Sequence, residues 1–270
     1  MKRKIANAFM ASLVFSGVSL VLAQSTEPPP IVKIIREDMK PGKGAAHEKT
    51  ESAYVRAFQK SKYPNYIAWE AMSGQTQVWF LEGYATYAGI EAAFKIANAE
   101  PLKTTLDQLD VQDGELRTGE RTMIARYLKD LSYFGAPLNL GKVHFVRVVV
   151  WRVRYGHEGE FSELRKIMNA AFEKAGVKST RVAYVVAEGA PLRTYLVVTP
   201  VESLSAVDEE PRWNNREAMG EGFERYQKLN SDIVVSTEWT LFAVNPKMSN
   251  PPKAYVDADP GFWTPKPAAK

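Results

Sequence analysis

Three histidines and their neighbours are the first residues to consider for chemistry. His47 and Glu51 belong to the run His47-Glu48-Lys49-Thr50-Glu51 and would share one face of a helix, since they are four residues apart. This spacing matches half of the zinc-binding pattern H-E-x-x-H. The second histidine of that pattern is missing, and no distant ligand stands out. We therefore predict no metal site and interpret His47 as a helix packing residue.

His144 and Arg147 lie in residues 143–155, an apolar run that predicts a strand. Because successive side chains of a strand point to opposite faces, these two residues would lie on different faces. Arg147 aligns with Lys33 in the internal repeat described below, and a recurring cation could line a barrel cavity and bind an anionic group. The alternative is a strand whose long side chains reach water. We interpret His157, in the turn that follows, as an exposed loop histidine.

Aromatic side chains are the richest candidates for a binding site. They lie on the predicted strands and second helices at Trp69, Trp79, Tyr84, Tyr87, Tyr184, Tyr195, Trp213, Phe223, Tyr226 and Trp239. Such rings form either plain core or a pocket between sheet and helices in each half. Arg126 could supply a positive charge there. The predicted ligand-binding residues are Trp69, Trp79, Arg126, His144, Arg147, Tyr184, Tyr195 and Trp239.

Several kinds of chemistry are excluded. The chain has no cysteine, which excludes disulfides, thiolate zinc sites, iron–sulfur clusters and cysteine nucleophiles. After residue 23 there is neither a phosphate-binding glycine loop nor the motif G-x-S-x-G, and the three histidines support no Ser-His-Asp arrangement. The catalytic residues are therefore unknown, and we expect no cofactor.

Each half of the chain has the pattern strand, helix, strand, strand, helix, strand. In the first half we predict strands over 31–39, 66–72, 77–83 and 121–128, a helix after Gly42 or Gly44, and a helix over 90–109 that breaks at Pro101. In the second half we predict strands over 143–155, 181–187, 193–199 and 235–245, a helix over 160–175, and a helical stretch over 207–229 that breaks at Pro211. Val148-Val149-Val150-Trp151 is apolar on both faces, which indicates a strand buried on both sides.

The two halves also align with each other. Met39-Lys40-Pro41-Gly42-Lys43 aligns with Val153-Arg154-Tyr155-Gly156-His157, and later positions align with little drift in the offset. The order βαββαβ is that of a ferredoxin-like unit. We therefore predict an α+β fold of two tandem ferredoxin-like units, whose open sheet faces cover each other.

On these features the chain resembles the dimeric α/β-barrel superfamily, which includes NIPSNAP-like and antibiotic-biosynthesis-monooxygenase-like proteins. The resemblance is carried by a strand that ends in Pro41-Gly42-Lys43 or Tyr155-Gly156-His157 before an amphipathic helix, followed by the hairpin and last strand. It implies one barrel built from two halves of one chain. Members of the superfamily bind haem, oxidise aromatic compounds without a cofactor or isomerise lactones. The axial histidine of the haem-binding branches has no counterpart here.

The N-terminus has the layout of a secretory signal peptide. A positive start, Lys2-Arg3-Lys4, precedes the uncharged run 5–23. The alternative is an uncleaved anchor, since these 19 residues approach the ~20 that span a bilayer. Cleavage would lower the net charge from +4 to +1, because the peptide holds three of the 35 basic and none of the 31 acidic side chains. We predict a periplasmic or secreted protein with no nucleic-acid partner and no membrane contact after cleavage.

The expected organisation is a signal peptide (1–23), a linker (24–30), two repeats (31–140 and 141–250) and a Pro-rich tail (251–270) that is extended or disordered. Phe262-Trp263 could pack onto the body. The leading hypothesis is a monomeric pseudo-dimer, or a higher oligomer, that binds a small, partly aromatic molecule. The alternatives are a cofactor-independent oxygenase or isomerase, with Arg126, Arg147 or His144 at its site, and a structural or protein-interaction module.

Overall fold

The computed structural model describes residues 27–264. The predicted signal peptide and the first three linker residues lie outside the described residues, as do residues 265–270. Within 27–264 no helix combines the length and the apolar character needed to cross a membrane.

The first half follows the predicted order of elements. Its strands are β1 (Ile31–Met39), β2 (Tyr66–Ala71), β3 (Gln77–Tyr84) and β4 (Arg117–Tyr127), and its helices are α1 (Gly44–Lys60), α2 (Tyr87–Ala97) and α3 (Leu102–Gly114). The Thr86 hydroxyl caps α2 by accepting from the Gly89 amide. Pro101 separates α2 from α3, since proline lacks the amide hydrogen that a continuous helix needs.

The second half repeats that order with a more broken second helical segment. Its strands are β6 (Phe145–Val153), β7 (Thr180–Glu188), β8 (Thr194–Val201) and β9 (Val234–Asn250), and its helices are α4 (Glu158–Lys174), α5 (Ser205–Asp208), α6 (Arg216–Met219) and α7 (Gly222–Ile233). The connection between the halves holds β5 (Tyr133–Phe134) and two single turns, η1 (Lys129–Leu131) and η2 (Leu140–Lys142). The helical stretch predicted over 207–229, with one break at Pro211, is thus three short helices, and Pro211 lies in the connection between α5 and α6.

Helix α4 shows how the sequence produces these elements. Phe161, Leu164, Met168 and Phe172 recur every three or four residues and are all buried on the sheet side. Two glutamates lie in the first turn and a lysine in the last, which complements the helix dipole. Gly176 follows the helix with a φ of +69°, the left-handed conformation that glycine adopts without strain.

The strands form a closed, eight-stranded antiparallel barrel, so the α+β class is confirmed. The strand order is β4-β1-β3-β2 in the first half and β9-β6-β8-β7 in the second. Antiparallel pairs β2–β9 and β4–β7 join the two halves at both seams. β5 adds a short pair to β7 outside the barrel proper. Closure leaves neither half with an open sheet edge.

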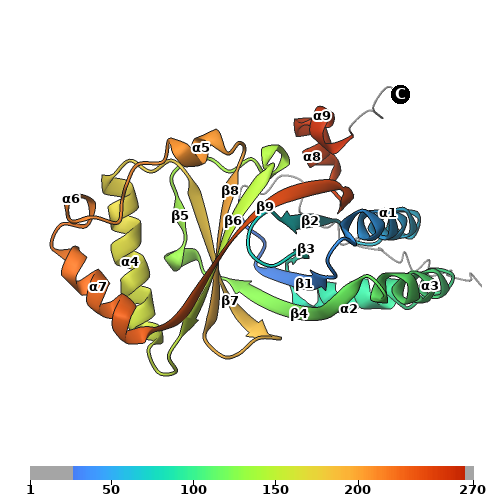
Figure 1. Cartoon of the computed structure of the whole chain (residues 1–270), viewed down its shortest axis with the longest axis horizontal. Helices are drawn as coiled ribbons and strands as arrows, with labels where there is room; N and C mark the ends of the chain where they lie inside the picture. The colour runs from blue at the N-terminus through green and yellow to red at the C-terminus, as the bar shows by residue number, and fades with distance from the viewer. Residues whose placement is uncertain (1–26, 265–270) are drawn as a thin grey trace, which may run out of the picture.

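Helices cover the outside of the barrel on two sides. In Figure 1, α1, α2 and α3 lie beside the first half, and α4, α6 and α7 lie beside the second. Val146 and Val148 of β6 face the barrel interior, whereas Val149 and Trp151 pack against α4 and α7. Both faces of this strand are therefore buried, which explains its continuous apolar run.

The last strand and the tail differ from the sequence prediction. β9 continues to Asn250 because its second part pairs with β2 of the other half after its first part pairs with β6. The tail forms α8 (Lys253–Ala258) and α9 (Pro260–Trp263) rather than an extended or disordered end. In Figure 1 these helices lie together near one end of the barrel.

The seam between β4 and β7 yields a prediction. Gly189 has a φ of +84°, and a Cβ at this position would clash with the backbone carbonyl of Thr122. Gly74, in the corresponding hairpin of the first half, has a φ of +77° and open space around it. Gly74→Ala should lower the free energy of unfolding by about 1–2 kcal/mol, the cost of a left-handed residue. Gly189→Ala should cost about 1–3 kcal/mol more, since the seam must also shift.

Urea denaturation of the two variants measures this difference. Equal losses of stability would show that the close approach of the β7–β8 turn to β4 does not support barrel closure.

Candidate functional site

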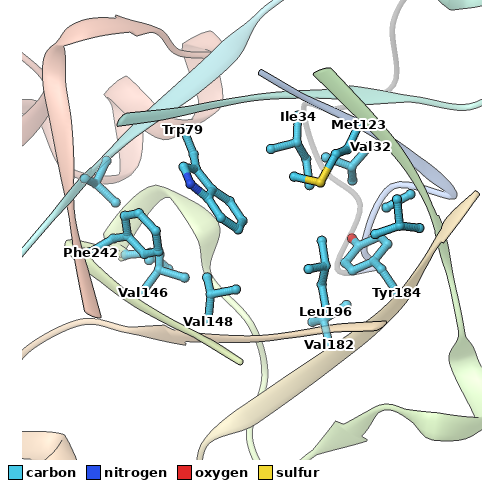
Figure 2. Close-up of a cluster of buried hydrophobic side chains, with 14 of the residues drawn as sticks. Val32, Ile34, Trp79, Met123, Val146, Val148, Val182, Tyr184, Leu196 and Phe242 are labelled. Atoms are coloured by element: carbon cyan, nitrogen blue, oxygen red, sulfur yellow. The ribbon is translucent and has the colours of Figure 1, made fainter. Parts of the chain in front are cut away.

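The barrel interior contains a cavity of about 140 Å³ that is partly open to solvent. Its walls come from the inner faces of strands in both halves and from the segments before β1 and after β9. The main lining side chains are Val32, Ile34, Ile67, Trp69, Trp79, Leu81, Leu140, Val143, Val146, Val182, Tyr184, Leu196, Val198, Val244, Tyr255 and Trp263. Figure 2 shows how several of these side chains converge on the interior from opposite walls.

Aromatic rings make up one wall. The ring of Phe242 packs 5.2 Å from that of Trp79 and 6.1 Å from that of Trp69, measured between centroids. Trp79 is 2% exposed, and its Nε1 donates to Gln77 Oε1 at 2.7 Å. The indole therefore offers a ligand its apolar surface rather than its N–H group.

Tyr184 is a polar group among the apolar lining residues, and its ring lies 5.9 Å from that of Tyr127. Burial, with Tyr127 and Tyr255 nearby, raises the pKa of the Tyr184 phenol above its usual value. The hydroxyl therefore stays protonated at neutral pH and can donate a hydrogen bond, but it is no base. Among the lining residues that the structure describes, Glu27 alone has a carboxylate or a cationic side chain.

The C-terminal segment closes one side of this cavity. Trp263 is 5% exposed and its Nε1 donates to the carbonyl of Gly141 at 2.7 Å. A Cβ at Gly141 would lie only 2.7 Å from the Cβ of Ala258, so the glycine permits this close contact. The ring of His144 stacks on Phe262 at 4.0 Å between centroids, and its Nε2 lies 2.8 Å from Asp259 Oδ2. Phe262-Trp263 thus packs onto the body, as the sequence suggested.

Three of the eight predicted ligand-binding residues line the cavity: Trp69, Trp79 and Tyr184. The cavity lies inside the barrel rather than between sheet and helices, because apolar side chains and, under α1 and α3, buried polar side chains occupy the space under the helices. The predicted location of the pocket, between sheet and helices, is therefore wrong. The other five predicted residues do not line the cavity.

Those five residues lie elsewhere in the structure. Tyr195 is on the helix side of the sheet, where its ring packs 4.2 Å from that of Phe161. Arg147 is on the same side, 3.3 Å from a carboxylate oxygen of Glu210 and above the half-exposed ring of Trp239.

Arg126 is exposed on β4. His144 holds the C-terminal segment, as described above. Arg147 is excluded from the interior by strand alternation, since Val146 and Val148 occupy the inward positions on either side of it.

Sequence reasoning missed the aliphatic and tail residues of the cavity. Val146, Leu196 and Val244 lie on inward strand positions, and Tyr255 and Trp263 come from the tail. Alternation along the strands separates the two faces, but it does not show which face points into the barrel. Tail aromatics among prolines were the available signal for the closing segment.

A second group of polar side chains lies outside the barrel, between β1, α1 and α3. Its ionisable members that could bind a cation are Glu37, His47, Glu51 and Asp113. Burial, with Glu37 and Asp113 close by, raises the pKa of Glu51 well above its usual value. Burial and Glu37 likewise raise the pKa of Asp113 to about 6, although His47 and Arg117 act against this. His47 is thus buried as predicted, but among charged partners rather than apolar ones.

The closing segment yields a prediction. Trp263→Ala should lower the free energy of unfolding by about 3–5 kcal/mol, the usual loss for a buried tryptophan. Trp239→Ala is the matched control, since Trp239 is 52% exposed. It should cost no more than about 1 kcal/mol, the scale of an exposed cation–π contact.

Equilibrium unfolding in guanidinium chloride compares the two variants. If Trp263→Ala were as stable as Trp239→Ala, the segment from residue 253 onward would not be an integral part of the fold.

Comparisons with known proteins identify the fold of this chain but no family to which it belongs. No protein-family profile matches the chain, and no curated protein is similar to it. An anthrone oxidase-like protein matches in structure with a TM-score of 0.57 and 12% identity, over 82% of this chain and 94% of that one. A candidate monooxygenase from Fusobacterium nucleatum subsp. nucleatum matches with a TM-score of 0.51 and 12% identity, over 80% and 93%.

A mutant chlorite dismutase from Candidatus Nitrospira defluvii also matches, with a TM-score of 0.49 and 7% identity, over 86% of this chain and 96% of that one. At these identities the likeness concerns the fold alone. The chain is an α+β protein with an eight-stranded antiparallel barrel, and this fold is shared with the anthrone oxidase-like protein.

Proposed function

We propose that the barrel interior binds a small, partly aromatic molecule. The observation that carries this proposal is the cavity in the barrel interior, with an apolar lining, the rings of Trp69 and Trp79, and the protonated hydroxyl of Tyr184. Ligand sites for small molecules combine such apolar walls with a few polar groups that set orientation. A phenol or a hydroxylated polycyclic compound fits this chemistry.

The cavity itself supports binding over a purely structural role. Protein interiors are normally packed as densely as organic crystals, and an unfilled space costs stability. A barrel meant only for protein contacts would gain stability from larger side chains at Val146 or Val198, both of which line the cavity. The C-terminal segment adds Tyr255 and Trp263 to the wall.

A cofactor-independent oxygenase is the second candidate. The specific observation in its favour is the shared fold of the anthrone oxidase-like protein and the candidate monooxygenase. Oxidation of an aromatic substrate without a cofactor requires a group that removes a substrate proton. Arg126, Arg147 and His144 do not line the cavity, and Tyr184 stays protonated. The Glu27 carboxylate is exposed at the surface and pairs with Lys129. The site chemistry therefore favours binding over turnover.

The wider organisation that we propose follows from the matching halves. In the sheet of each half, the last strand of that half is followed by its first, third and second strands. This common order supports two tandem ferredoxin-like units in a NIPSNAP-like arrangement. A single chain would then mimic a dimer. Export by cleavage after Ala23 would place the chain in the periplasm or outside the cell. The sequence of residues 1–23 supports this.

Binding is tested with 1-naphthol and anthrone as probes. Both should raise the melting temperature of the protein and quench its tryptophan fluorescence, because Trp69 and Trp79 line the cavity. Val198→Phe should weaken binding at least tenfold by filling the cavity. Tyr184→Phe should weaken 1-naphthol binding by about five- to tenfold, the value of one neutral hydrogen bond.

The control is Val111→Phe, the same substitution at a residue that is 74% exposed. It should bind both probes as the wild type does. Failure of both probes and of a wider set of aromatic compounds to bind the wild type would contradict the proposal. Sustained oxygen uptake with anthrone would instead support the oxygenase candidate.

A further inference from the structure

A buried polar cluster lies on the helix side of the first half, on the opposite face of the sheet from the cavity. Glu37 comes from β1, His47 and Glu51 from α1, and Asp113 from the end of α3. In the order just given, the four residues are 6%, 1%, 6% and 1% exposed. Residues far apart in the chain thus meet at one buried point.

The imidazole of His47 lies at the centre of the cluster. Its Nε2 is 2.7 Å from Glu37 Oε2, 3.8 Å from Glu51 Oε1 and 3.7 Å from Asp113 Oδ1. One potential ligand atom from each of the four residues lies within 4.8 Å of all the others. For comparison, a tetrahedral ion with bonds of about 2.0–2.2 Å holds its ligand atoms about 3.3–3.6 Å apart. Small side-chain movements would therefore bring the four atoms into a coordination shell.

Arg117 forms ion pairs with two of the carboxylates through the oxygens that do not face His47. Its Nη1 lies 2.7 Å from Glu37 Oε1, and its Nε lies 2.8 Å from Asp113 Oδ2. Each of these carboxylates therefore has one oxygen on the guanidinium and the other directed at His47. Outer partners of this kind orient ligands in metal sites.

The carboxyl groups of the cluster crowd one another. Three of them are buried beside one guanidinium and one imidazole, and burial together with this crowding raises the pKa of Glu51 and of Asp113. Glu120 also contacts Arg117, at the surface. Asp113 Oδ1 has no hydrogen-bond partner in the described part of the chain although its residue is only 1% exposed. A buried, unpaired carboxylate oxygen is costly, and it is here aimed at the other three groups.

The second half shows that the fold does not need this cluster. The positions that correspond to Glu37, His47 and Glu51 are Trp151, Phe161 and Arg165, at an offset of 114. There the rings of Trp151 and Phe161 pack 5.9 Å apart, and Arg165 Nη2 donates to the carbonyl of Leu131 at 3.1 Å. The same layer of the barrel is thus built with two aromatic rings in one half and with ionisable groups in the other.

We propose that Glu37, His47, Glu51 and Asp113 bind one divalent transition-metal ion, of the Mn²⁺, Fe²⁺ or Zn²⁺ kind. One imidazole nitrogen with three carboxylate oxygens suits these ions, whereas Mg²⁺ and Ca²⁺ prefer sites made of oxygen alone. The ion offsets the carboxylate charge that burial disfavours, and it ties α1 and α3 to β1. Sequence reasoning missed the site because Glu37 and Asp113 are distant from the His47–Glu51 pair along the chain.

The site is tested on the full chain without a tag, after treatment with a chelator and dialysis. Zn²⁺ or Mn²⁺ should bind with one ion per chain by mass spectrometry of the metal content and should raise the melting temperature, whereas Mg²⁺ at the same concentration should not. Co²⁺ should produce visible d–d absorption. Asp113→Asn and Glu51→Gln keep the side-chain shape and should weaken binding at least tenfold.

Glu120→Gln is the matched control, because Glu120 contacts Arg117 but lies outside the four ligands. It should bind the ion as the wild type does. Glu51→Gln without metal should be about as stable as the metal-free wild type, since Glu51 makes no ion pair with Arg117 and its raised pKa favours the neutral acid; lost binding in this variant is then not lost folding. The proposal would be overturned if the wild type bound no ion after loading. Equal binding by Asp113→Asn and Glu120→Gln would also overturn it. Neither result depends on ligand binding in the barrel.

Discussion

Closure of the sheet at its two seams is the constraint on which the rest of the structure depends. Once β2 pairs with β9 and β4 with β7, every strand has one face toward the interior and one toward the helices. Successive residues of one strand then lie in different surroundings, one in the barrel interior and the next under the helices. Val146 lines the cavity and Val148 packs in the barrel interior, while Arg147, between them, contacts Glu210 on the other side.

The same closure separates two regions of different chemistry. The interior is apolar and aromatic, with a protonated phenol at Tyr184, and the C-terminal segment closes it through Trp263. The layer under α1 and α3 contains Glu37, His47 and their neighbours, which are buried and charged. β1 contributes to both, with Val32 and Ile34 facing inward and Glu37 facing the helices. A ligand in the barrel and an ion in the outer layer would therefore stabilise the same strand from opposite sides.

Local patterns predicted much of this fold from the sequence. Apolar runs, turn glycines and the break at Pro101 predicted the strands and helices, and the run Val148–Trp151 correctly indicated burial on both faces. Nonlocal pairing was beyond such patterns. β9 extends to Asn250 because β2 of the other half is its partner, and Glu37 meets His47 only through the packing of α1 on β1. For the site, alternation separated Arg147 from Val146 but did not show which of them faces the cavity.

Diffraction from crystals soaked with 4-bromophenol is the most direct test of the central claim, that the barrel interior is a binding site for a small aromatic molecule. We predict an anomalous bromine peak inside the barrel, among Trp79, Val146 and Leu196, with the phenol oxygen within hydrogen-bond distance of the Tyr184 hydroxyl. A barrel interior filled by its own side chains, with no bromine peak there at saturating 4-bromophenol, would contradict the account.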